Sequence, residues 1–150
     1  MTISISIENP KTPEVEALLR ESNTLMQALF SPEENHLLSI EELCAENVLL
    51  FIGRIDGLVA GSGALSIQAD YGEVKSMFTS RDFRNQGLAE AILTKLVQEA
   101  RARSLPFLRL ETGDLLHEAH RLYSRHGFVE RGPFGDYEDN GSSIFLEKAL

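Results

Sequence analysis

The sequence predicts a mixed α/β fold in which about four helices cover both faces of a central, mostly antiparallel sheet of about seven strands. The chain has 150 residues without a linker, repeat or low-complexity tract, so residues 1–150 are expected to form one domain. Strand-like and helix-like runs follow one another in the order strand, two helices, three strands, helix, strand, helix, two strands. A strand–helix–strand unit beside an antiparallel hairpin favours a mixed sheet.

The elements of the first half are predicted from apolar periodicity and from turn residues. Alternating isoleucines predict a strand over residues 2–8, and apolar residues three and four apart predict an amphipathic helix over residues 13–30. Ser39 followed by Glu42 resembles a capping box and predicts a short second helix. Asp56-Gly57 between two β-rich runs predicts a hairpin, whose strands span residues 48–54 and 58–67.

The second half contains the predicted crossover. A strand over residues 73–79 leads through a polar loop into a long amphipathic helix over residues 87–103, which Pro106 terminates. The next strand spans residues 107–111. An apolar stripe from Leu115 to Tyr123 then predicts a helix ending at Gly127, and the last strands span residues 128–131 and 143–148.

Composition excludes several classes of partner. With 14 basic and 23 acidic residues the formal net charge is −9, which argues against nucleic-acid binding and is compatible with a cationic partner such as an amine. No apolar run approaches the roughly 20 residues of a membrane span. Residues 1–10 lack the pattern of a signal peptide, so a cytoplasmic location is expected. The single cysteine, Cys44, is interpreted as a core thiol rather than a nucleophile.

The polar loop before the long helix carries the strongest chemical signal. The first turn of a helix leaves its N–H groups unpaired at the positive end of the helix dipole, and these groups can hold a phosphate. Gly87 permits close approach of the backbone to a ligand, and Arg84 can add a charge-assisted bond. The alternative is an ordinary solvated helix start.

Two blocks of sequence resemble motifs of the GNAT superfamily of N-acetyltransferases. Residues 84–89 are similar to its Q/R-x-x-G-x-G/A segment, which binds the pyrophosphate of acetyl-CoA. Residues 119–128 are similar to a later A-x-x-L-Y-x-x-x-G-F segment. The order of elements extends the likeness over essentially the whole chain, and residues 111–113 and 133–137 resemble those of a bacterial group of small acetyltransferases.

The resemblance implies that acetyl-CoA is the cofactor and that no metal takes part. Many members bind the cofactor through an Asn three residues before the alanine of the second block, where this chain has Leu116, so a different contact is expected. The main chain of the strand before the loop would pair with the pantetheine arm, and the Met77 N–H would stabilise the oxyanion. The implied cofactor-binding residues are Met77, Phe78, Thr79, Arg84, Asn85, Gln86, Gly87, Leu88 and Ala89.

Direct transfer to an amine requires a base and an acid. The resemblance places the base at Glu73, with His120 or water in reserve, and the acid that protonates the CoA thiolate at Tyr123. The alternatives are an exposed strand carboxylate at Glu73 and a core aromatic at Tyr123. His117 and His120 are interpreted as helix-surface residues rather than metal ligands.

The arrangement of the superfamily would bring several polar loop residues to the acceptor side. They are Glu33, His36, Asp136 and Tyr137, which could bind a cationic amine or simply be solvated. We therefore expect an N-acetyltransferase that acts on a primary amine of a small molecule or peptide. The alternatives are a protein lysine or N-terminal acetyltransferase and a non-catalytic acyl-CoA-binding or regulatory module. Homodimerisation is left open.

Overall fold

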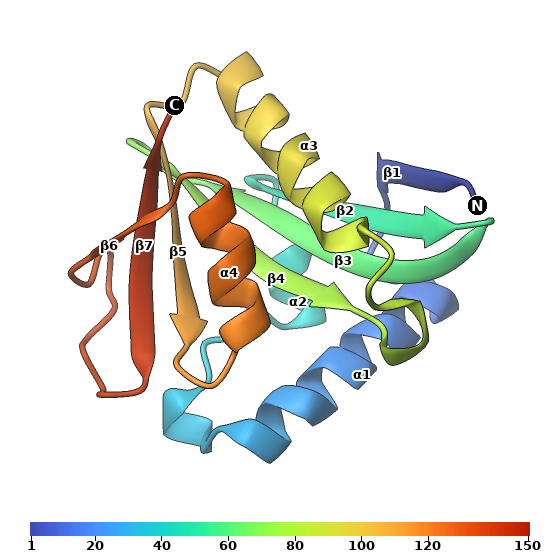
Figure 1. Cartoon of the computed structure of the whole chain (residues 1–150), viewed down its shortest axis with the longest axis horizontal. Coiled ribbons are helices and arrows are strands. Elements are labelled where there is room, and N and C mark those ends of the chain that lie inside the picture. The colour runs from blue at the N-terminus through green and yellow to red at the C-terminus, as the bar shows by residue number, and fades with distance from the viewer.

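The computed structural model describes all residues, 1–150, and is built on one seven-stranded sheet in the order β1-β2-β3-β4-β5-β7-β6 (Figure 1). Every neighbouring pair is antiparallel except β4 and β5, which are parallel. The strands are β1 (Ile3–Ile7), β2 (Val48–Ile55), β3 (Leu58–Ile67), β4 (Gly72–Thr79), β5 (Phe107–Gly113), β6 (Val129–Arg131) and β7 (Ser143–Ala149). The helices are α1 (Pro13–Leu29), α2 (Ile40–Leu43), α3 (Leu88–Ala102) and α4 (His117–Arg125). The predicted fold class is confirmed.

Helices cover both faces of the sheet and form two separate hydrophobic cores. On one face, α3 and α4 bury the larger core, which includes Ile92 and Leu96 of α3 and Leu122 of α4. On the other face, α1 and α2 bury a smaller core around Val15 and Leu43. The sheet is thus the middle of three layers, because the apolar stripes of the helices on each side are buried against one of its faces.

Two glycines on β3 allow α3 to pack close to the sheet. A Cβ atom at Gly61 would lie 2.8 Å from Leu88 Cδ2, and one at Gly63 would lie 2.6 Å from Ile92 Cγ2. Side chains at these two positions would therefore push α3 outward. The close contact places the first residue of α3 next to the end of β4, where the polar loop before α3 lies.

The parallel strands β4 and β5 separate soon after they begin. They are paired only at Gly72–Leu108 and Glu73–Arg109, after which each strand continues with its antiparallel neighbour alone. A bulge in β4 accompanies the separation: Ser76 has a φ of 55°, and its carbonyl accepts a 2.7 Å hydrogen bond from the Ser62 hydroxyl. Figure 1 shows the two strands diverging toward α1 and α4. This opening leaves the inner edges of both strands without a strand partner.

Most predicted elements lie within two residues of their expected limits, and the differences have local causes. β5 continues to Gly113 and α4 begins only at His117, because antiparallel pairing with β7 extends through Gly113–Ser143. The interpretation of Cys44 as a core thiol was wrong: α2 has a single turn, and Cys44 is its exposed C-terminal cap. None of the helices combines the length and apolar character needed to span a bilayer.

Candidate active site

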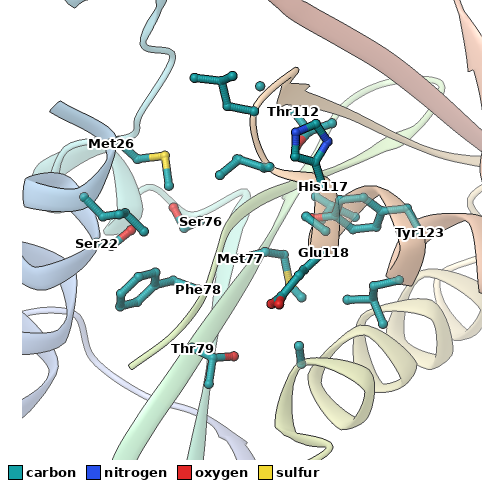
Figure 2. Close-up of a pocket in the computed structure, with 18 of the residues that line it drawn as sticks. Ser22, Met26, Ser76, Met77, Phe78, Thr79, Thr112, His117, Glu118 and Tyr123 are labelled. Carbon is teal, nitrogen blue, oxygen red and sulfur yellow. The ribbon is translucent and has the colours of Figure 1, made fainter. Parts of the chain in front are cut away.

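The opening between β4 and β5 forms a cavity of about 670 Å³, which we call the main cavity. Its walls are residues 74–79 of β4, residues 111–113 of β5, the second half of α1 and one face of α4. The loop before α3 closes one end. Figure 2 shows Thr79 at that end, Met26 and Thr112 at the other, and Tyr123 between them.

The loop before α3 has the geometry of an anion-binding site. Asn85 and Gly87 have φ values of 63° and 81°, and no hydrogen bond uses the backbone N–H groups of residues 84–90. No side chain caps the helix either. The Arg84 guanidinium is held nearby by a 3.3 Å bond from its Nε to the Thr79 carbonyl. Unpaired N–H groups, a helix dipole and a guanidinium suit a pyrophosphate.

The predicted cofactor residues differ in what they offer to this cavity. Arg84, Asn85, Gly87, Leu88 and Ala89 line it, whereas Gln86 does not. The Leu88 side chain is buried in the core, and Phe78 is buried against α1, so mainly the backbones of these two residues remain for a ligand. On the separated edge of β4, Figure 2 shows Met77 and Thr79 beside the cavity.

A carboxylate of α1 anchors the same loop. Glu21 Oε1 accepts a 2.8 Å bond from the Ser80 hydroxyl, and Glu21 Oε2 accepts a 2.9 Å bond from the Arg81 amide. These bonds tie the end of β4 to a helix on the opposite face of the sheet. Nothing in the sequence pattern singled out Glu21, because its two partners lie 59 and 60 residues further along the chain.

Tyr123 of α4 is buried, and its hydroxyl is free to act on a ligand. The side chain is 5% exposed, lines the main cavity and packs edge-to-face against Phe128. Its hydroxyl makes no hydrogen bond within the protein. Burial, and secondly the charge of Glu111, raise the pKa of Tyr123 well above its ordinary value. The hydroxyl is therefore protonated at neutral pH and available as a donor.

Glu73 is buried, not exposed, but it lies outside the main cavity. It is 8% exposed, and Oε2 accepts a 2.5 Å hydrogen bond from the Tyr137 hydroxyl. The Lys75 ammonium is 3.6 Å from the same oxygen and donates to the Tyr137 hydroxyl (2.7 Å) and to the His36 carbonyl (2.8 Å). Lys75 lines the main cavity, so it stands between that cavity and Glu73.

The four residues predicted for the acceptor side come together in a second recess of about 560 Å³. Its lining includes Glu33, His36, Asp136 and Tyr137, together with Glu73. The ring of His36 packs edge-to-face on Tyr137, with centroids 5.0 Å apart, and His36 lines both cavities. His36 and Tyr137, with Lys75, thus form the wall between the acidic recess and the main cavity.

Glu111 is a site residue to which sequence reasoning gave no role. It lies on β5, lines the main cavity, and its Oε2 accepts a 2.7 Å bond from the Ser143 hydroxyl. Its charge acts on Tyr123 and also on Tyr137. One signal could have found it: ligands of open α/β sheets bind at the carboxyl ends of parallel strands, and Glu111 is near that end of β5.

The histidines of α4 are not gathered into a site. His120 Nε2 is 2.8 Å from the Gly113 carbonyl and does not line the main cavity, whereas His117 does. No group of three or more His, Cys, Asp or Glu side chains is arranged to hold a metal ion. Leu116, which replaces the expected Asn, lines the main cavity with an apolar side chain.

Two separated parallel strands, a helix start with unpaired N–H groups and a tyrosine hydroxyl on the same cavity suit the binding of an acyl-CoA thioester and the transfer of its acyl group. The chain belongs to the acetyltransferase (GNAT) family, which residues 14–128 match. It is an acetyl-CoA-dependent N-acetyltransferase, as the sequence predicted.

Relatives and solved structures agree with this family. The chain is 37% identical over 152 aligned positions to the IAA acetyltransferase of Azospirillum brasilense, covering 99% of this chain and 98% of that protein. A crystal structure from Klebsiella pneumoniae, assigned as an acyl-CoA N-acyltransferase, is 30% identical, covers 99% and 97% of the two chains and has a TM-score of 0.81. PaiA N-acetyltransferase of Thermoplasma acidophilum, solved with coenzyme A, has a similar fold with a TM-score of 0.77, 16% identity and full coverage of both chains.

Proposed function

We propose that the protein transfers the acetyl group of acetyl-CoA directly to a primary amine, with the Tyr123 hydroxyl protonating the departing CoA thiolate. One observation carries the proposal: the Tyr123 hydroxyl, which has no hydrogen-bond partner within the protein, faces the same cavity as the unpaired N–H groups of the loop before α3. A thioester anchored at the loop would extend along β4 toward that hydroxyl.

The binding of acetyl-CoA follows from the polar groups along this path. The loop amides and Arg84 would hold the pyrophosphate. The inner edge of β4 at Met77 and Thr79 would pair with the amides of the pantetheine arm, because this edge has no strand partner. The Met77 N–H is our candidate for stabilising the oxyanion that forms on the acetyl carbonyl.

The reaction balances without a covalent enzyme intermediate. The amine nitrogen attacks the thioester carbon, the carbon–sulfur bond breaks, and the thiolate takes the Tyr123 proton while a base takes a proton from the amine. Transfer through a cysteine is disfavoured, because Cys44 is exposed at the end of α2 and does not line the main cavity.

Two carboxylates are candidates for the base. Glu73, assigned from the resemblance, could receive a proton only through Lys75 and Tyr137, since these two groups separate it from the main cavity. Glu111 lines the main cavity itself and needs no relay. Direct access favours Glu111, and Glu73 remains the candidate for a relayed transfer.

Glu33, His36, Asp136 and Tyr137 remain our candidates for the acceptor side. Glu73 and Glu138 line the second recess as well, so that it holds four carboxylates with Glu33 and Asp136. Their negative potential would attract a protonated amine. Of these four residues only His36 also lines the main cavity, so His36 is the member placed to touch an acceptor there.

The pH dependence of turnover identifies the base. A Glu→Gln change keeps the shape but removes basicity, so the rate should fall most at low pH, where free amine is scarce, and recover as pH rises toward the amine pKa near about 10. We would measure free thiol release by the parent, Glu73→Gln and Glu111→Gln, with Glu118→Gln as a control that also lines the cavity (Figure 2). Profiles parallel to the parent in both variants would assign the proton to water or to His120. No turnover by the parent with any amine would refute the proposed function.

A further inference from the structure

Three leucines that are distant in sequence lie exposed around the main cavity. They are Leu29 at the end of α1 (37% exposed), Leu37 in the segment before α2 (37%) and Leu115 in the turn after β5 (51%). The protein exposes only seven large hydrophobic side chains, so nearly half of them gather at this one cavity. An apolar cluster of this kind on an otherwise acidic protein marks a binding surface.

The leucines lie at the end of the cavity away from the cofactor loop. Met26 precedes Leu29 by one helical turn, and Thr112 lies just before the turn that holds Leu115; Figure 2 shows both at the end opposite Thr79. With the pyrophosphate at the loop and the thioester near Tyr123, this end is left for the acceptor. Its lining continues inward with Phe30 and Leu38, which are apolar as well.

Two charged groups near this end, Lys75 and Glu34, already have partners within the protein. The Lys75 ammonium is bound to the His36 carbonyl and the Tyr137 hydroxyl. Glu34 accepts from the Ser142 hydroxyl and the Ser31 amide. An acceptor that enters here therefore meets apolar surface and engaged charges, which would bind a second cationic or anionic group of the acceptor poorly.

We infer that the acceptor is a primary amine whose carbon skeleton carries an aromatic or branched aliphatic group, held between Leu29, Leu37 and Leu115. This inference rests on the proposed function and narrows its substrate class. Two different surfaces then recognise the acceptor. The acidic recess attracts the protonated amine by long-range electrostatics, and the leucines contact the apolar group of the acceptor.

A matched set of amines tests the inference. Phenethylamine carries an apolar group, ethylamine lacks it, and putrescine replaces it with a second cation. With saturating acetyl-CoA we expect kcat/KM for phenethylamine to exceed that of both others by about tenfold or more. Leu37→Ser and Leu115→Ser should lower the phenethylamine value by about 3- to 30-fold and leave the ethylamine value unchanged. Leu58, an exposed leucine of the β2–β3 hairpin that does not line the main cavity, supplies the control: Leu58→Ser should change neither value.

Equal kcat/KM for the three amines, or equal losses for all amines in the leucine variants, would overturn the inference. Failure of the proposed function looks different, since no amine would then release free thiol. In that case titration calorimetry with the CoA-saturated protein still tests the inference. Tighter binding of phenethylamine than of ethylamine, and loss of this difference in Leu37→Ser, would support it. Equal binding of the two amines would refute it.

Discussion

The Tyr137 hydroxyl donates a 2.5 Å hydrogen bond to the Glu73 carboxylate and so ties the connection between β6 and β7 to the first residues of β4. The same hydroxyl accepts a 2.7 Å bond from Lys75, which places a half-buried tyrosine between an anion and a cation. Phe134 and Phe145 pack edge-on or tilted against the Tyr137 ring. This contact folds residues 132–142 over the sheet and completes the wall between the acidic recess and the main cavity.

Loss of stability at alkaline pH follows from this burial. Desolvation raises the pKa of Tyr137 first, with the Glu73 charge next, and it also raises the pKa of Tyr123. The unfolded chain releases these protons near about pH 10, whereas the folded protein keeps them. The free energy of unfolding is therefore fully present below about pH 10 and falls above it, by at most about 1.4 kcal/mol per pH unit for each tyrosine.

Denaturant unfolding at a series of pH values checks this expectation, with tyrosinate absorbance as a second readout. Tyr137→Phe should show a smaller decline above about pH 10, because one of the coupled groups is gone. A folded protein whose three tyrosines all ionise at the ordinary tyrosine pKa would contradict the burial argument.

Tyr123→Phe should lower kcat by about 10- to 10⁴-fold while leaving the Kd of acetyl-CoA nearly unchanged, because proton donation matters only as the thiolate departs. Tyr71→Phe is the matched control: it removes a hydroxyl from a tyrosine that lines the second recess and not the main cavity. Equal kcat values for Tyr123→Phe and the parent would return Tyr123 to a purely packing role.

Gly87→Glu should weaken CoA binding by about tenfold or more, since a carboxylate would project into the anion-binding loop. Gly57→Glu separates this effect from backbone strain. Gly87 and Gly57 have φ values of 81° and 84°, and a Cβ atom at either meets nothing within 4 Å. Both variants should lose about 1–2 kcal/mol of stability from the left-handed conformation, but only the first should lose CoA affinity in a calorimetric titration. Equal affinities would refute the loop as the pyrophosphate site.

Glu21→Gln should raise the KM for acetyl-CoA about 3- to 30-fold, equivalent to about 0.6–2 kcal/mol, with kcat unchanged. The reason is that Glu21 holds Ser80 and the Arg81 amide, and so positions the loop without touching the cofactor. Glu16→Gln on the same helix breaks only a surface pair with Arg20 and should leave the KM unchanged. A fall in kcat with an unchanged KM would contradict this positioning role.

The elements and the cofactor loop were predictable because their signals are local. Apolar periodicity reports which face of a segment is buried, and together with turn and capping residues it located all seven strands and four helices. The loop before α3 works through backbone N–H groups of consecutive residues, so the spacing around Gly87 is visible in the sequence. The family resemblance added Tyr123, whose burial the helical stripe also indicates.

The tertiary structure decided what depends on contacts between distant segments. The brief pairing of β4 with β5 opens the main cavity, and this places Glu111 inside it and Glu73 behind Lys75 and Tyr137. Leu29, Leu37 and Leu115 look like ordinary apolar residues of three separate segments until the fold gathers them. Their role cannot be read from periodicity, because periodicity describes one element at a time, whereas a binding surface is made where several elements leave a space between them.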